Sequence, residues 1–90
     1  MSRIKHAFKD KAKVGYLTAG DGGIAKSVEY FLALANGGVN LLEVGIPYSD
    51  PVADGPVIQA AMERSLESGT TVATSLEIIK QIRAKSEVAI

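Results

Sequence analysis

The spacing of apolar residues along this chain switches repeatedly between two residues, the repeat of a β-strand, and about 3.6 residues, the repeat of an α-helix. Strand-like alternation occupies residues 14–18, 41–46 and 87–90, and helix-like spacing occupies residues 4–8, 24–35, 56–66 and 72–82. Strands that alternate with helices in this way are parallel and are joined by right-handed crossovers. The sequence therefore predicts an α/β fold with about three parallel strands, helices covering both faces of the sheet, and a single domain over residues 1–90.

Glycine, proline and short polar residues mark the expected ends of the helices. The turn Gly20–Gly23 should connect the first strand to the next helix, and Asn36–Gly38 should end that helix in a left-handed conformation. Asp54 is a candidate N-terminal cap for the third helix, with Pro56 in its first turn. In the last helix, we expect the buried stripe to consist of Val72, Leu76, Ile79 and Ile82.

Composition excludes several classes of function. Ten basic and ten acidic residues give zero net charge, so nothing in the balance indicates binding to nucleic acid or to an anionic membrane. The chain has no cysteine, which excludes thiolate chemistry and is compatible with the cytoplasm, where we expect the protein. The single histidine, His6, lies in a charged segment without a second ligand nearby. We expect it to be solvated, and we expect no metal site and no membrane span.

The most informative local feature is a carboxylate inside a buried-strand pattern. Glu43 alternates with apolar residues and shares a face with Leu41 and Gly45. A charge in such surroundings is costly unless it is paired, so Glu43 is either a catalytic carboxylate or an edge residue that faces water. Ligands of parallel sheets bind at the carboxyl ends of the strands, and Asp54 lies in the loop after this strand. Together Glu43 and Asp54 could divide acid and base roles, although capping by Asp54 remains the alternative.

A second motif suggests nucleotide binding. Residues Gly20 to Ser27, GDGGIAKS, follow a strand, open a helix and come close to the phosphate-binding pattern GxxxxGK[ST]. Ala25 replaces the glycine that lets such a loop wrap a phosphate, and Asp21 adds negative charge. A glycine turn that simply precedes a helix explains the same residues, so nucleotide binding is the more remote alternative.

Two strings of residues resemble a known family. The first is YLTAGD, residues 16–21, and the second is EVGIPYSDPVADGP, residues 43–56. Their order and spacing are similar to the N-terminal part of the tryptophan synthase alpha subunit. This resemblance implies a TIM (β/α)8 barrel, of which 90 residues would form the N-terminal portion, a partial domain. The chain departs from the family at Gly15, where proline is usual, and at Gly22-Gly23, where Asp-Pro is common.

The resemblance also implies an activity. The family cleaves indole-3-glycerol phosphate to indole and glyceraldehyde 3-phosphate without a metal or organic cofactor in this subunit. Glu43 would be the general acid and base, and Asp54 would hold the indole N–H. Tyr16 and Thr18 would line the substrate pocket.

Further implications concern partners and the extent of the site. The loop around Asp50 and Pro51 would face a beta subunit that carries pyridoxal phosphate, in an alpha2beta2 assembly. The phosphate site of such barrels comes from loops after the seventh and eighth strands, so we expect the 90-residue chain alone to be inactive. Two alternatives remain: another phosphate-binding β/α-barrel enzyme, and a non-catalytic oligomeric barrel fragment.

Overall fold

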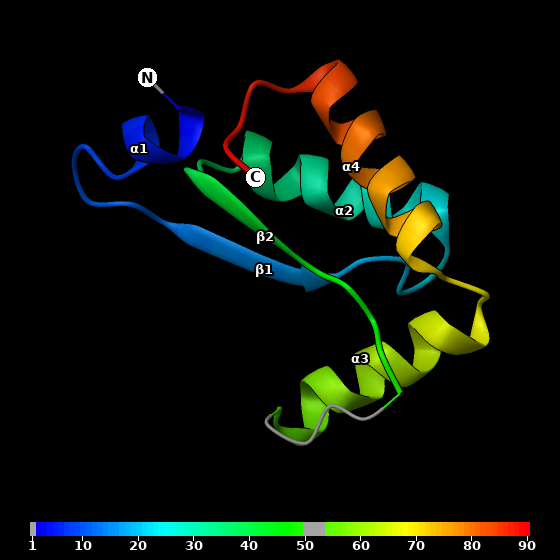
Figure 1. The fold of residues 1–90 in the computed structure, drawn as a ribbon. Coiled ribbons are helices and arrows are strands. Elements are labelled where there is room, and N and C mark those ends of the chain that lie inside the picture. Colours follow the sequence, from blue (N-terminus) through cyan, green and yellow to red (C-terminus); the bar gives the residue numbers. More distant parts are fainter. Residues whose placement is uncertain (1, 50–53) are drawn as a thin grey trace.

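The computed structural model describes residues 2–49 and 54–90 of the chain. Helices and strands alternate along most of it (Figure 1). In chain order the elements are α1 (Arg3–Ala7), β1 (Val14–Thr18), α2 (Ile24–Asn36), β2 (Leu41–Gly45), α3 (Pro56–Glu67) and α4 (Val72–Lys85). The predicted α/β class is confirmed, and the first strand has the predicted bounds.

The sheet consists of β1 and β2, paired in parallel from Val14 with Leu41 to Thr18 with Gly45. The third predicted strand, at residues 87–90, contributes one parallel bridge between Ala89 and Leu41 in the described structure. The amide of Leu42 donates to the carbonyl of Ala89 at 2.8 Å. The strand order is therefore that of consecutive β/α units, each strand beside the one before it.

One face of the sheet carries the core. Leu17 and Val44 pack against a cluster whose largest fully buried side chains are Phe31 of α2, Ile78 and Ile82 of α4, and Leu42 of β2. Helices α2 and α4 lie together above this face, whereas α3 is drawn below the strands, near their carboxyl ends (Figure 1). The expectation of helices on both faces is wrong for the described part of the chain, because α3 docks at the ends of the strands instead of across the sheet.

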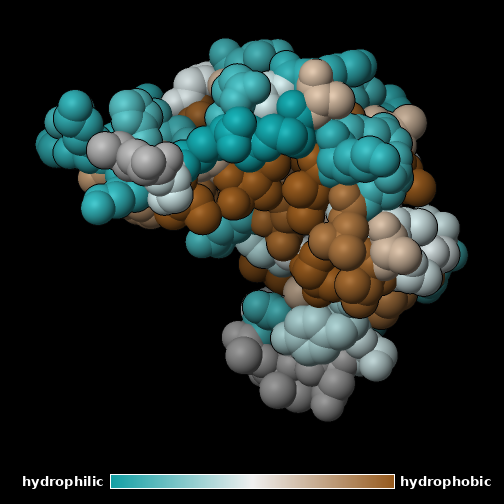
Figure 2. Space-filling view, turned by 45° about the horizontal axis from the view of Figure 1, so that its top comes forward, coloured by the Kyte–Doolittle hydropathy of each residue, from teal (hydrophilic) through white to brown (hydrophobic). Residues whose placement is uncertain are grey.

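Apolar residues also reach the surface. Figure 2 shows them gathered in one continuous area across the middle of the molecule, bordered along its upper edge by hydrophilic residues. Val57 of α3 is 81% exposed, and Val72 and Leu76 of α4 are 61% and 57% exposed.

Two helix predictions need correction. The N-cap of α3 is Gly55 and makes no side-chain capping bond, so Asp54 is not the cap. The stripe predicted for α4 is also wrong in part, because Val72 and Leu76 are exposed. The buried residues of α4 are Ser75, Ile78 and Ile82. By contrast, α2 ends at Asn36 as predicted, and Gly38 follows with a φ of +103°.

Candidate active site

Three of the predicted site residues share one face of the sheet. Tyr16 of β1 is the register partner of Glu43 of β2, and Thr18 is the partner of Gly45. Partners in a parallel pair project on the same side, here the face opposite to Leu17 and Val44. Glu43 is exposed and Tyr16 is half-buried. The apolar surroundings expected for Glu43 are therefore absent from the described structure, and its side chain faces water.

Two neighbours, Thr18 and Gly45, determine the position of the Tyr16 ring. The sequence did not indicate that these three residues lie together. Its hydroxyl lies 3.3 Å from Oγ1 of Thr18. A Cβ atom at Gly45 would lie 2.6 Å from Cζ of Tyr16, so the ring occupies the space above this glycine. Gly45 belongs to the site although it carries no functional group.

Tyr16 and Thr18 also line a mainly apolar cavity of about 220 Å³ between β1, α2 and α3. Val57, Ile58 and Ala61 contribute its α3 wall. Ligand pockets generally measure about 300–1,000 Å³. The cavity is thus a partial pocket that brings two predicted substrate-binding residues together, while Glu43 stands on the neighbouring strand outside its lining.

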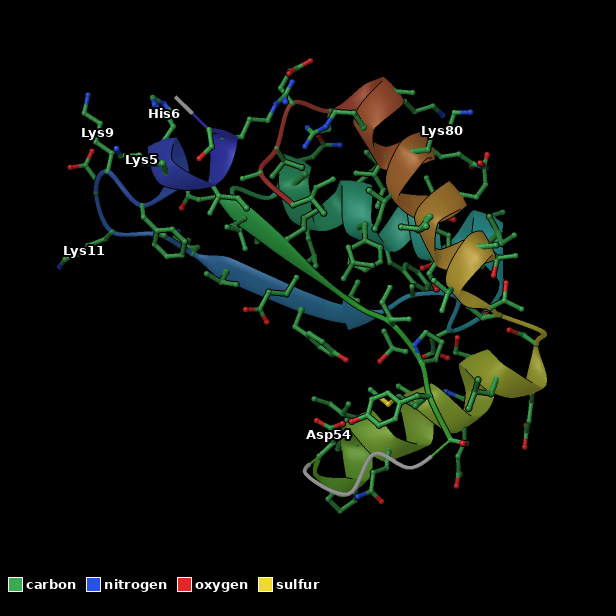
Figure 3. The ribbon with its side chains drawn as sticks, viewed as in Figure 1. Lys5, His6, Lys9, Lys11, Asp54 and Lys80 are labelled. Carbon is green, nitrogen blue, oxygen red and sulfur yellow. The ribbon has the colours of Figure 1, made fainter. Side chains whose placement is uncertain are left out.

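The backbone of Asp54 is held by a side chain of α3. Its carbonyl oxygen accepts a hydrogen bond of 2.6 Å from Nε2 of Gln59, one turn into α3. Figure 3 shows Asp54 at the start of this helix, below the sheet. Since Gly55 is the cap, the carboxylate of Asp54 is not used to start the helix. Asp50 and Pro51, the predicted partner contacts, lie outside the described residues.

Serine hydroxyl groups connect α3 to the loop after β1. Ser65, which is fully buried, donates to the carbonyl of Ala19 at 2.5 Å. The exposed Ser68 has its Oγ 2.7 Å from the carbonyl oxygen of Ser65 and 3.1 Å from that of Gly20, so its one hydroxyl proton is shared between these two acceptors. From the other side, the amide of Gly20 donates to Oγ of Ser27 at 3.0 Å. The carbonyl of Ala19 and the amide of Gly20 are thereby paired within the protein. Sequence reasoning missed these serines because nothing in their spacing indicates a shared target.

An ion pair reinforces the same junction. Nε and Nη2 of Arg64 each lie 2.9 Å from a carboxylate oxygen of Asp21, in a two-bond arrangement. The hydrogen bond to Asp21, followed by its charge, raises the pKa of Arg64. Helix α3 therefore begins two residues after Asp54 and is attached near its other end to the loop that follows Tyr16 and Thr18.

The glycine turn does not have the features of a nucleotide site. Ser27, which would have to face a metal or phosphate, is 2% exposed and accepts from Gly20. Nζ of Lys26 lies 3.8 Å from Oε2 of Glu29 on the same helix. These contacts favour the alternative in which residues 20–27 form a structural turn.

Within residues 2–49 and 54–90, no three His, Cys, Asp or Glu side chains gather into a potential metal site. None of the helices described is long and apolar enough to cross a membrane. His6 is exposed on α1 (Figure 3).

Consecutive parallel β/α units, in which each strand is followed by a helix and pairs with the next strand, are typical of β/α-barrel proteins. Comparison with known proteins specifies the family. The family model for "Tryptophan synthase alpha chain" matches residues 2–90. The chain belongs to the tryptophan synthase alpha chain family, as the resemblance indicated, which decides against the alternative of a different phosphate-binding barrel.

Individual relatives agree with this assignment. The chain is 58% identical to the tryptophan synthase alpha chain of Coxiella burnetii over 91 residues, covering 100% of this chain and 36% of that protein. It is 54% identical to the alpha chain of Chlamydia caviae over 89 residues, covering 98% of this chain and 35% of that protein. The chain thus spans about a third of the length of these curated relatives.

Solved structures of the family superpose closely. Tryptophan synthase from M. tuberculosis, in its aminoacrylate-bound form, matches with a TM-score of 0.90 and 34% identity, covering 100% of this chain and 39% of that one. The tryptophan synthase complex from Pyrococcus furiosus matches with a TM-score of 0.83 and 38% identity, covering 89% of this chain and 33% of that one. The two β/α units described here therefore have the arrangement found in TIM barrels of this family.

Proposed function

We propose that this chain supplies the acid–base half of a site that cleaves indole-3-glycerol phosphate to indole and glyceraldehyde 3-phosphate. The observation that carries the proposal is the pairing of Tyr16 with Glu43 on the open face of the sheet, in a chain that belongs to the alpha chain family. An aromatic ring beside a carboxylate suits a substrate that is itself a planar aromatic ring and must gain a proton.

In the proposed reaction, Glu43 gives a proton to the indole ring carbon that bears the glycerol phosphate chain. It then takes the proton of the adjacent hydroxyl as the carbon–carbon bond breaks, so the bond electrons return to the ring and the side chain leaves as an aldehyde. Asp54 accepts a hydrogen bond from the indole N–H and stabilises the positive charge of the protonated ring. Its availability for this role is supported by the finding that Gly55 caps α3.

The proposal extends to cofactor, partner and location. The reaction needs no metal or organic cofactor in this chain, and pyridoxal phosphate belongs to a beta subunit that consumes the indole. Support for such a partner comes from the Pyrococcus furiosus relatives, one of which is described as a tryptophan synthase a2b2 complex. Asp50 and Pro51 are the proposed contacts with that subunit. The absence of cysteine suits a cytoplasmic location.

The test is a fusion of this chain to the part of the Coxiella burnetii alpha chain that lies beyond the match, assayed for indole release. Glu43→Gln should lower kcat by about 10²- to 10⁴-fold, the usual contribution of general acid–base catalysis. Glu67→Gln, at an exposed glutamate near the end of α3, is the matched control and should leave the rate unchanged. Full activity of the Glu43→Gln fusion would overturn the proposal, and the unfused 90-residue chain should release no indole.

A further inference from the structure

The ring of Tyr16 takes the place of a side chain at position 45. A Cβ atom built on Gly45 would lie 2.6 Å from Cζ and 2.9 Å from Cε2 of Tyr16, and it would overlap the hydroxyl oxygen as well. Ordinary van der Waals contact begins at about 3.4 Å. Any residue other than glycine would therefore have to displace the ring.

The register of the strands shows which way the ring leans. Tyr16 is paired with Glu43, whereas Gly45 is paired with Thr18, two residues nearer the carboxyl ends of the strands. The ring therefore does not lie over Glu43, its register partner, but is directed toward the carboxyl ends of the strands. There its hydroxyl lies 3.3 Å from Oγ1 of Thr18. The direct neighbour of Tyr16, Glu43, is left exposed.

We propose that Gly45 is a positioning residue of the site, an inference that rests on the proposed function. Because Gly45 has no side chain, the ring of Tyr16 lies beyond Glu43 and the carboxylate stays accessible to a planar aromatic substrate. The hydroxyl of Thr18 fixes the ring in this place. Gly45 thus determines the position of the Tyr16 ring relative to the carboxylate of Glu43.

The backbone itself does not require glycine at this position. Gly45 is absent from the glycines with positive φ, so an alanine is compatible with the strand. The three atoms nearest to such a methyl group all belong to the side chain of Tyr16. In Gly45→Ala the ring must swing back toward Glu43 or away from the sheet, and both movements change access to the carboxylate. Removing the ring by Tyr16→Ala should make the methyl group harmless.

The ring position can be measured without turnover, by NMR of the 90-residue chain. We expect nuclear Overhauser contacts between the Tyr16 ring and the α-protons of Gly45, and a ring-current shift of those protons that Tyr16→Ala abolishes. Gly55→Ala is the matched control and should leave the Tyr16 signals unchanged, because within the described part of the chain no atom beyond the two neighbouring residues lies within 4 Å of a Cβ at Gly55. An α-proton shift at Gly45 that is insensitive to Tyr16→Ala would overturn the inference.

The functional consequence is measured in the fusion by a double-mutant cycle. Misplacement by about 1 Å in an active site can cost on the order of 100-fold in rate, so Gly45→Ala should lower kcat/KM by up to that factor while Tyr16 is present. In the Tyr16→Ala background the same change should have no further effect. If Gly45→Ala lowers kcat/KM equally in both backgrounds, Gly45 does not act through the ring.

A folding defect of Gly45→Ala and a failure of the proposed function can each be distinguished from a failure of the inference about Gly45. If Gly45→Ala does not fold, the double variant with Tyr16→Ala should fold again, and persistent unfolding would contradict the inference. A fusion without indole release would count against the proposed function, whereas the NMR contacts would still decide whether Gly45 seats the Tyr16 ring.

Discussion

Ser65 shows how a single hydroxyl group supports the site. It is 0% exposed, and its Oγ donates to the carbonyl of Ala19, directly after β1. Ser65→Ala removes this donor and leaves a buried carbonyl without its partner, so we expect a loss of about 1–3 kcal/mol in the free energy of unfolding. Urea titration followed by circular dichroism measures the change. Ser68→Ala is the comparison, because Ser68 is exposed, and its cost should be smaller. Equal stability of wild type and Ser65→Ala would contradict the assignment.

The sequence predicted the positions of some site residues correctly and of others not. Alternation with a period of two was sufficient to put Tyr16 and Thr18 on one face of β1, and Glu43 on one face of β2. The role of Asp54 as a cap was wrong because Pro56 is the first residue of α3, which moves the cap to Gly55. The position of the Tyr16 ring depends on which residue of β2 is paired with Thr18. The apolar pattern of a single strand does not determine its register with a neighbouring strand, so the sequence could not predict this position.

At the scale of the element, α4 provides a direct comparison between a buried and an exposed apolar residue. Ile78 is 0% exposed in the core, and Leu76 is 57% exposed. Ile78→Ala should cost about 2–5 kcal/mol through lost burial and the cavity left behind. Leu76→Ala should change stability by no more than about 0.5 kcal/mol. Denaturant midpoints of the two variants give the answer. A larger loss for Leu76→Ala would mean that α4 packs with the originally predicted stripe.

The error in the α4 stripe has a physical origin. Val72, Leu76 and Ile79 are spaced as a helical face, and so are Ser75, Ile78 and Ile82. The two faces are related by a rotation about the axis of α4 that corresponds to about one residue. Hydrophobicity favours the face of Val72, Leu76 and Ile79, because Ser75 on the other face is polar. In the structure Ser75 is buried and its hydroxyl donates to the carbonyl of Thr71 at 2.8 Å. A small residue whose hydroxyl donates to the carbonyl at the start of its own helix can be buried without losing a hydrogen bond, and hydropathy cannot indicate this.

At the scale of the whole molecule, an ion pair joins the first helix to the last segment. Nη2 and Nε of Arg3 in α1 lie 2.6 Å and 3.2 Å from Oε2 of Glu87, which precedes the bridge at Ala89. The hydrogen bond from Arg3 and then its charge lower the pKa of Glu87, and the charge of Arg83 acts in the same direction. The order of elements predicted the β/α class, but no local pattern indicated this contact between residues 84 positions apart.

The sign of the pKa change determines how this contact depends on pH. A carboxyl group whose pKa is lowered by folding stabilises the folded state above the usual glutamate value of 4.5, and the contribution disappears as the pH falls through the lower folded value. Acidification from neutral pH should therefore release α1 from the segment around Glu87, with a midpoint below 4.5 in the amide chemical shifts of residues 3–7. Arg3→Gln keeps His6 and Glu87 but removes the pair, so its α1 shifts should not follow this transition. Identical titrations of the two proteins would show that the pair does not hold α1 in place.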